Sequence, residues 1–136
     1  MKIPVHVYKD PPAMKLLIIE DEEILARVLK EKFVKEGFQV ELAMDGVSAL
    51  PGVENFRPDL ILLDLILPGK DGFQVLKELK AHPDFKRIPV IVLSNLGQDE
   101  EIKSALNLGA VDYLVKTQHP INEVVEKVKT YLIKPK

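Results

Sequence analysis

The chain has 136 residues, of which 46% are hydrophobic and 29% are charged, and its formal net charge at pH 7 is −2. These proportions are typical of one compact domain with a buried core and exclude a disordered chain. The 19 basic and 21 acidic residues are spread along the sequence, which excludes a global field that recruits nucleic acid or an anionic membrane. Cysteine is absent, and no apolar run approaches the roughly 18 to 20 residues of a membrane span, so we expect a cytoplasmic protein.

The first 13 residues are expected to form an N-terminal extension, either a tag, an alternative start or a loose arm. They contain three prolines and no regular period, whereas a strong apolar run begins at Met14. His6 lies in this extension, where we expect it to be exposed to solvent and assign it no chemistry. The folded domain is therefore expected to span residues 14–136.

From Lys15 onward, short apolar runs alternate with longer amphipathic stretches. This pattern is typical of repeated βα units around a parallel sheet. The predicted strands are 16–19, 39–43, 60–63, 90–93 and 111–115. Four of them are almost continuously apolar, as expected for strands covered by helices on both faces, whereas 39–43 is half polar and is predicted to be an edge strand.

Helical spacing of apolar residues predicts the intervening helices. The first helix is predicted from one apolar face made by Ile24, Leu25, Val28, Leu29 and Phe33. Gly37 is expected to end that helix. The last helix is predicted from the stripe Val124, Val125, Val128 and Leu132, with Pro120 in its first turn. Further helices are predicted near 73–80 and 99–108, and a short or broken one over 47–56, because Pro51 and Gly52 interrupt its pattern.

Five strands that alternate with helices predict an α/β fold. Right-handed crossovers restrict it to a doubly wound (βα)5 flavodoxin-like three-layer sandwich, with a parallel five-stranded sheet of order 2-1-3-4-5. In such a fold ligands bind in a crevice beyond the carboxyl ends of the strands. The residues that follow the strands are therefore the candidates for a functional site.

Polar residues follow four of the predicted strands. They are Glu20 and Asp21 after the first strand, Asp64 after the third, Ser94 after the fourth and Lys116 after the fifth. Singly, an Asp or Ser in such a place is usually a helix cap or turn former, and the lysine a solvated loop charge. As a group these residues need a different interpretation, because two like unit charges about 4 Å apart repel by roughly 4 kcal/mol at an effective dielectric constant of about 20. Three carboxylates at one edge of a sheet therefore indicate a cation.

Oxygen ligands without a nearby histidine favour a hard ion, with magnesium as the best fit and manganese as an alternative. Asp64 is the best nucleophile, because its neighbours supply both metal and counter-charge. A carboxylate can form an acyl phosphate, and Ser94 and Lys116 could hold the remaining phosphoryl oxygens. The sequence thus predicts a domain that receives a phosphoryl group and need not be a full kinase.

Four strings stand at characteristic distances from one another: LLIIEDEEILARVLKEKF, PDLILLDLILPGKDGF, IPVIVLS and GAVDYLVK. With these strings the chain resembles the receiver domain of bacterial two-component response regulators over residue 14 to about residue 132. The resemblance implies that Glu20 and Asp21 are the acidic metal pair, Asp64 the phosphoacceptor, Ser94 the switch hydroxyl and Lys116 the phosphate-binding lysine. It further implies that Tyr113 is the aromatic rotamer switch and that the backbone carbonyl of Ile66 completes the metal shell. The side chains of Ile66 and Leu96 would flank the water that hydrolyses the acyl phosphate.

The same resemblance implies the partners. The phosphoryl group would come from a histidine kinase or a histidine phosphotransfer protein in a magnesium-dependent reaction. A downstream protein would bind the face made by the fourth helix, the fifth strand and the last helix, with no direct nucleic-acid or membrane binding. The chain would be a phosphoacceptor with at most slow self-dephosphorylation rather than an enzyme. It looks like a stand-alone receiver or a fragment cut from a longer regulator.

Two positions depart from the family pattern. Most members have proline after the conserved lysine, often with a cis peptide bond, but here Thr117 follows Lys116. A non-proline cis bond costs about 2.5 to 4 kcal/mol, so either the loop bears that strain or Lys116 enters the site by a different path. Lys70 stands in the PGKDG turn, where the family commonly has an apolar residue, either as an added cation near the site or as a solvated loop charge.

Three other functions are compatible with the same fold. A flavin enzyme is disfavoured because the acidic run EDEE after the first strand would repel a phosphate. A phosphatase with an aspartyl nucleophile would carry a second Asp two residues later as general acid, but position 66 is Ile. A pseudo-receiver that serves only as an interaction module and is never phosphorylated is the third alternative, which the complete set of acidic, Ser and Lys positions disfavours.

Overall fold

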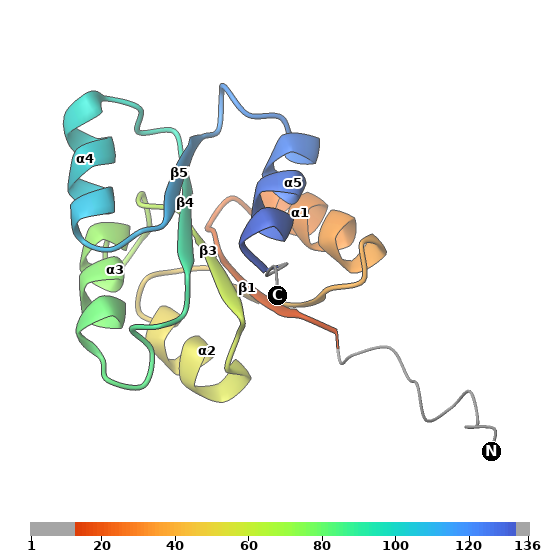
Figure 1. Cartoon of the computed structure of the whole chain (residues 1–136), viewed down its shortest axis with the longest axis horizontal. Coiled ribbons are helices and arrows are strands. Elements are labelled where there is room, and N and C mark those ends of the chain that lie inside the picture. The colour runs from red at the N-terminus through yellow and green to blue at the C-terminus, as the bar shows by residue number, and fades with distance from the viewer. Residues whose placement is uncertain (1–12, 133–136) are drawn as a thin grey trace, which may run out of the picture.

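Five parallel strands form one sheet in the order β2-β1-β3-β4-β5. The computed structural model describes residues 13–132, so the predicted N-terminal extension with His6 lies outside the described residues except for Ala13. The strands are β1 (Lys15–Ile19), β2 (Gln39–Ala43), β3 (Leu60–Leu63), β4 (Val90–Ser94) and β5 (Asp112–Val115). The helices are α1 (Glu23–Lys35), α2 (Ala49–Phe56), α3 (Gly72–Ala81), α4 (Asp99–Asn107) and α5 (Ile121–Leu132) (Figure 1). The predicted fold class and strand order are confirmed, and β2 is an edge strand as predicted.

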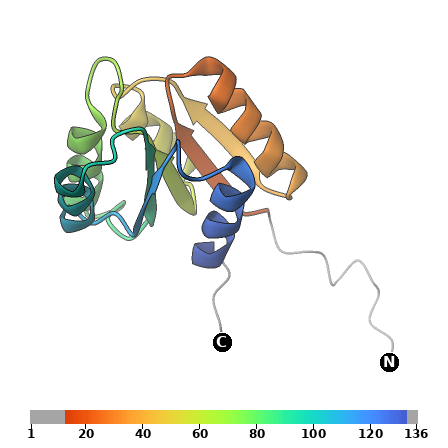
Figure 2. The same cartoon turned by 90° about the horizontal axis from the view of Figure 1, so that it is seen from above.

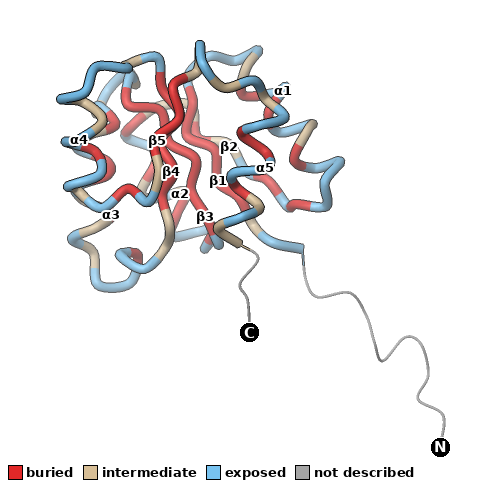
Figure 3. The backbone as a smooth tube through the Cα atoms, turned by 45° about the horizontal axis from the view of Figure 1, so that its top comes forward, coloured by how far each residue is buried: buried red, intermediate tan, exposed pale blue. Residues whose placement is uncertain are grey.

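Helices cover both faces of the sheet. Figure 2 shows α1 and α5 (orange and blue) on one side, with α3 and α4 (green to teal) on the other. The three central strands β1, β3 and β4 are buried except for Lys15 at the start of β1, and the buried residues are red in Figure 3. Alternate strand residues serve the two cores: Leu17 and Ile61 pack toward α2, α3 and α4, whereas Leu16 and Leu60 pack toward α1 and α5. The near-continuous apolar runs of the sequence therefore have this double burial as their cause.

The first helix ends at a glycine as predicted. Gly37 has φ = +97°, and its N–H donates to the carbonyl of Val34 while the N–H of Phe38 donates to the carbonyl of Phe33. This hydrogen-bond pair is the Schellman motif, which needs a left-handed residue at this point. The turn places the ring of Phe38 edge-on against that of Phe33, with 5.2 Å between centroids. The chain then enters β2 alongside β1.

The prediction of one apolar face on α1 is wrong for Ile24 and Val28 and right for Leu25, Leu29 and Phe33. Leu29 and Phe33 are fully buried, but Ile24 is 80% exposed and Val28 is also exposed. Ala26, which the predicted stripe omitted, is fully buried instead. The reason is geometric: residues three and four apart share a helix face, and here two adjacent apolar stripes run along α1 while only one packs against the sheet.

The short second helix agrees with the sequence, but it is not broken. Pro51 is the third residue of α2, where backbone N–H groups have no intrahelical partner, so its missing N–H costs nothing. The N–H of Gly52 donates to the carbonyl of Ser48 at 3.0 Å, and the helix continues to Phe56. Over residues 13–132, no helix combines the length and apolarity that a membrane crossing requires.

Candidate functional site

The strand order brings the predicted site residues to one edge of the sheet. Ile19 and Leu63 are register partners in neighbouring strands, so Glu20 and Asp64 leave the sheet side by side. The N–H of Asp64 donates to the carbonyl of Ile19 at 3.0 Å, and the N–H of Lys116 donates to that of Ser94 at 2.9 Å. Ser94 lies within β4 rather than after it, because its register partner is Val115. The predicted convergence therefore exists, while the roles of these residues remain predictions.

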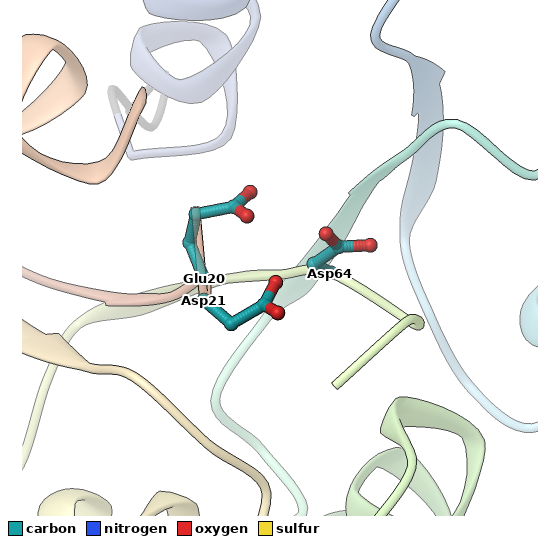
Figure 4. Close-up of side chains that lie close together, drawn as sticks. All are labelled: Glu20, Asp21 and Asp64. Atoms are coloured by element: carbon teal, nitrogen blue, oxygen red, sulfur yellow. The ribbon is translucent and has the colours of Figure 1, made fainter. Parts of the chain in front are cut away.

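Three carboxylates form an acidic cluster, the name used here for Glu20, Asp21 and Asp64. One oxygen of each lies within 4.8 Å of the others (Figure 4). Glu20 and Asp64 are 2% and 4% exposed, whereas Asp21 is exposed to solvent. A set of convergent carboxylate oxygens is the donor chemistry that magnesium and manganese prefer. The residues present thus fit a hard divalent cation.

The loop after β3 begins by orienting Asp64. The N–H of Ile66 donates to Asp64 Oδ1 at 3.1 Å, while the side chain of Ile66 is 51% exposed. Lys70 was predicted either as an added cation near the site or as a solvated loop charge, and the structure shows it in an ion pair. Its ammonium is paired with Glu78 of α3 at 2.6 Å and is only partly exposed.

Lys116 reaches the acidic cluster directly. Its Nζ lies 2.8 Å from Asp64 Oδ2 and 2.9 Å from Glu20 Oε1, and its side chain is only 10% exposed. The peptide bonds of the described residues are all trans, so threonine at position 117 does not keep the lysine from the site. Nζ also lies 3.2 Å from Glu22 Oε2. The contact of Glu22 with Lys116 was not predicted. The run EDEE shows that the segment is acidic, but not which of its glutamates contacts a lysine 94 positions later.

The buried charges shift one another. Burial raises the pKa of Glu20 to about 7, against hydrogen bonds from the Glu22 N–H and Lys116 that lower it, and the charge of Asp64 adds to the rise. Burial alone would lower the pKa of Lys116, but hydrogen bonds to Asp64 and Glu20 raise it above its usual range. The two shifts do not describe a simple ion pair, because Lys116 divides its charge between two carboxylates. Lys116 therefore stays charged, whereas its hydrogen bond and charge offset only part of the effect of burial on the pKa of Glu20.

Without a divalent cation, the free energy of unfolding should fall as the pH rises from 4.5 to about 7. Folded Glu20 holds its proton in this range while unfolded Glu20 has lost it, so the stabilisation is complete below pH 4.5 and is lost on passing about pH 7. At 1.36 kcal/mol per pH unit the loss is on the order of 3 kcal/mol. Urea unfolding in a chelator between pH 5 and pH 8 would measure it, with Glu20→Gln as the control that should show a flatter dependence. An equal pH dependence in both proteins would contradict the assignment.

Ser94 and Tyr113 are joined through Leu96 in the loop after β4. Ser94 is fully buried and its Oγ accepts a hydrogen bond from the Leu96 N–H at 3.3 Å. The hydroxyl of Tyr113 donates to the carbonyl of the same Leu96. Burial, with the charge of Glu101, raises the pKa of Tyr113 to about 12, so the phenol keeps its proton at neutral pH. One loop residue thus links the predicted switch hydroxyl to the predicted aromatic switch.

Comparison with known proteins identifies the family. The family model described as the response regulator receiver domain matches residues 16–129. Sporulation initiation phosphotransferase F of Bacillus subtilis is 38% identical over 118 residues, which cover 87% of this chain and 93% of that protein. Response regulator PleD of Caulobacter vibrioides is 39% identical over 112 residues, 82% of this chain. The match spans only 24% of PleD.

Solved structures agree. A putative response regulator from Chloroflexus aurantiacus superposes with a TM-score of 0.82 at 31% identity, covering 90% of this chain and 99% of that one. The receiver domain of a sensor histidine kinase from Pseudomonas aeruginosa, whose active-site cleft coordinates a magnesium ion, gives 0.78 at 28% identity and covers 88% and 97%. With the fold, the acidic cluster and the lysine in place, this chain belongs to the response regulator receiver domain family.

Proposed function

We propose that the protein is a phosphoacceptor of a two-component system in which Asp64 takes a phosphoryl group from a histidine kinase or histidine phosphotransfer protein. The observation that carries this proposal is the environment of Asp64: a buried carboxylate within hydrogen-bond reach of Lys116 and beside two further carboxylates. Receiver domains are phosphoacceptors rather than conventional enzymes, and the chain shares their fold and family.

In the proposed reaction, a carboxylate oxygen of Asp64 forms a bond to phosphorus. The bond between phosphorus and the donor's imidazole nitrogen breaks, and the leaving imidazole takes up a proton. The acidic cluster and the backbone carbonyl of Ile66 would hold a magnesium or manganese ion, which when bound neutralises charge on the transferring group. Lys116 would release the carboxylates that it contacts now and bind a phosphoryl oxygen instead.

The signal would leave the site through Ser94 and Tyr113. A hydroxyl that turns toward the phosphoryl group must give up the hydrogen bond from the Leu96 N–H. Because Leu96 also holds the hydroxyl of Tyr113, the aromatic ring would be released at the same time. The ring belongs to β5, between α4 and α5, so the face made by these three elements would change for a downstream protein target.

Incubation with acetyl phosphate and magnesium tests the proposal. The intact mass of the protein should rise by one phosphoryl group, and a chelator should prevent the gain. Treatment with hydroxylamine should then remove the group, because acyl phosphates react with this nucleophile whereas phosphate esters of serine do not. A folded protein that gains no mass with any small phosphodonor would instead support a module that only binds partners.

The acyl phosphate should be lost slowly, because apolar side chains flank the approach of water to Asp64. Neither Ile66 nor Leu96 can orient a water molecule through a side-chain hydrogen bond. The double variant Ile66→Asn with Leu96→Glu should lose its phosphoryl group about tenfold faster, less than the roughly 10²–10⁴-fold of a fully positioned general base. The decay of the phosphorylated mass at fixed magnesium measures this rate.

A matched control is Leu106→Glu, which places the same charge on an exposed position of α4. It should decay as the unmodified protein does. An equal or slower decay in the double variant would show that the two side chains leave the approach of water unaffected.

A further inference from the structure

The loop between β2 and α2 presses against the loop that carries the Asp64 site. The N–H of Gly46 donates to the carbonyl of Pro68 at 3.1 Å. A β-carbon at position 46 would lie 1.7 Å from the carbonyl oxygen of Lys70 and 2.5 Å from its carbonyl carbon. Real β-carbons essentially never come closer than 3.0 Å to such atoms. Any side chain at position 46 would therefore force the two loops apart by more than about 1 Å.

The pressed loop, residues 65–71, leads directly from the acidic cluster. Two hydrogen bonds hold its first residues. The N–H of Ile66 donates to Asp64 Oδ1, and the N–H of Gly72 donates to the carbonyl of Leu65 at 2.9 Å. Gly72 closes the same loop at its far end, where a β-carbon would lie 2.3 Å from the carbonyl oxygen of Asp64. The backbone of the loop is therefore fixed at both ends. We expect a displacement of residues 68–70 to shift the backbone near Ile66.

The residue after Gly46 also approaches this loop, but less closely. A β-carbon at Gly69, whose φ is +81°, would lie 3.1 Å from Val47 Cγ2, so one methyl group of Val47, a residue that is 62% exposed, lies against this loop. Asp45 holds the supporting loop in shape, since its Oδ1 accepts a hydrogen bond from the Ser48 N–H at 2.7 Å. The support therefore has its own rigid turn.

We propose that Gly46 is a positioning residue for the metal and phosphoryl site. Because Gly46 has no side chain, the β2–α2 loop can approach residues 68–70 closely and fix their position. Through these residues the loop also positions the backbone of Ile66, whose N–H orients Asp64. The inference rests on the proposed function for its link to phosphorylation, but its effect on cation binding stands independently. Gly46 itself contacts neither the cation nor the phosphoryl group.

The test compares Gly46→Ala with Gly52→Ala. The control adds the same methyl group in α2, where a β-carbon would lie 3.6 Å from a side-chain atom of Leu17, an ordinary contact. Manganese affinity, measured from the electron paramagnetic resonance of the free ion, should weaken about tenfold in Gly46→Ala, at the low end of the roughly 10–100-fold losses seen when support of metal ligands is removed. Gly52→Ala should bind as the unmodified protein does.

A purely structural effect is separated by Val53→Ala, which removes buried volume in the middle of α2, at a position outside both loops. It should lower the melting temperature yet keep its manganese affinity. In phosphorylation by acetyl phosphate, Gly46→Ala should need about tenfold more magnesium for half-maximal rate. If no protein in the series is phosphorylated, the proposed function fails, whereas the manganese affinities still decide the role of Gly46.

Unchanged manganese affinity in a folded Gly46→Ala protein would overturn the inference. Should circular dichroism show that this variant does not fold, Val47→Ala replaces it, because it removes the neighbouring contact on Gly69 without a clash. The manganese affinity of Val47→Ala should then be about two- to threefold weaker, less than the roughly 10–100-fold loss when support of a metal ligand is removed entirely. An unchanged manganese affinity would overturn the inference equally.

Discussion

Asp64→Asn is expected to gain no phosphoryl group under conditions in which the unmodified protein is fully labelled. Asparagine keeps the size of the side chain but has no anionic oxygen to attack phosphorus, so the loss should be complete rather than partial. The measurement is intact mass after incubation with acetyl phosphate and magnesium. The fold should persist, because the amide oxygen can still accept the hydrogen bond from the Ile66 N–H, while Lys116, to which the amide NH2 group offers no acceptor, keeps its contact with Glu20.

Asp71→Asn and Asp45→Asn are the controls. Both carboxylates are nearby in sequence, but each accepts a hydrogen bond from a backbone N–H at a turn or helix start: Asp71 from Gln74 and Asp45 from Ser48. Both variants should therefore be labelled normally. Equal labelling of Asp64→Asn and the unmodified protein would move the acceptor to one of these positions.

Asp21→Ala should abolish the stabilisation of the protein by magnesium. A ligand that binds only the folded state at 100 times its dissociation constant adds about 2.7 kcal/mol, which raises the melting temperature of a domain of this size by several degrees. Without Asp21 the acidic cluster loses one of its three oxygen donors, and the rise should disappear. In a chelator the variant should be no less stable than the unmodified protein, because one repelling charge has gone.

Asp59→Ala is the matched control for this experiment. Asp59 precedes β3 at the opposite end of the sheet, where its Oδ2 accepts a hydrogen bond from the Lys15 N–H at 2.8 Å. That variant should lose some stability at every magnesium concentration but keep the full magnesium response. An undiminished response in Asp21→Ala would remove Asp21 from the metal site.

The sheet and the convergence of the site residues could be predicted because both follow from short-range patterns. Buried parallel strands are apolar on both faces and the edge strand β2 alternates between polar and apolar residues, so the strand limits are visible in the sequence: 39–43 and 60–63 are observed as predicted, and the other strands differ by a single residue. Parallel strands also share one direction. Polar residues at their carboxyl ends must therefore meet at one edge, whatever their separation along the chain.

Contacts between loops and the choice between helix faces could not be predicted in this way. Ile24 and Val28 have the same spacing as the buried stripe of α1, and only the position of the sheet decides which stripe is covered. Nothing local distinguishes Gly46 from a glycine in an ordinary turn, because the carbonyl that excludes a side chain there belongs to Lys70. The reach of Glu22 to Lys116 likewise depends on the packing of two distant strand ends.

Leu96 is bound through its N–H by Ser94 and through its carbonyl by Tyr113. This double tie has a thermodynamic consequence, because coupling between two sites is equal in both directions. If the phosphoryl group on Asp64 favours one orientation of Tyr113, a target that binds this orientation must favour the phosphorylated form by the same free energy. The equilibrium between phosphorylated and unphosphorylated protein would then depend on the concentration of the target. The downstream protein would therefore influence how much of this protein is phosphorylated.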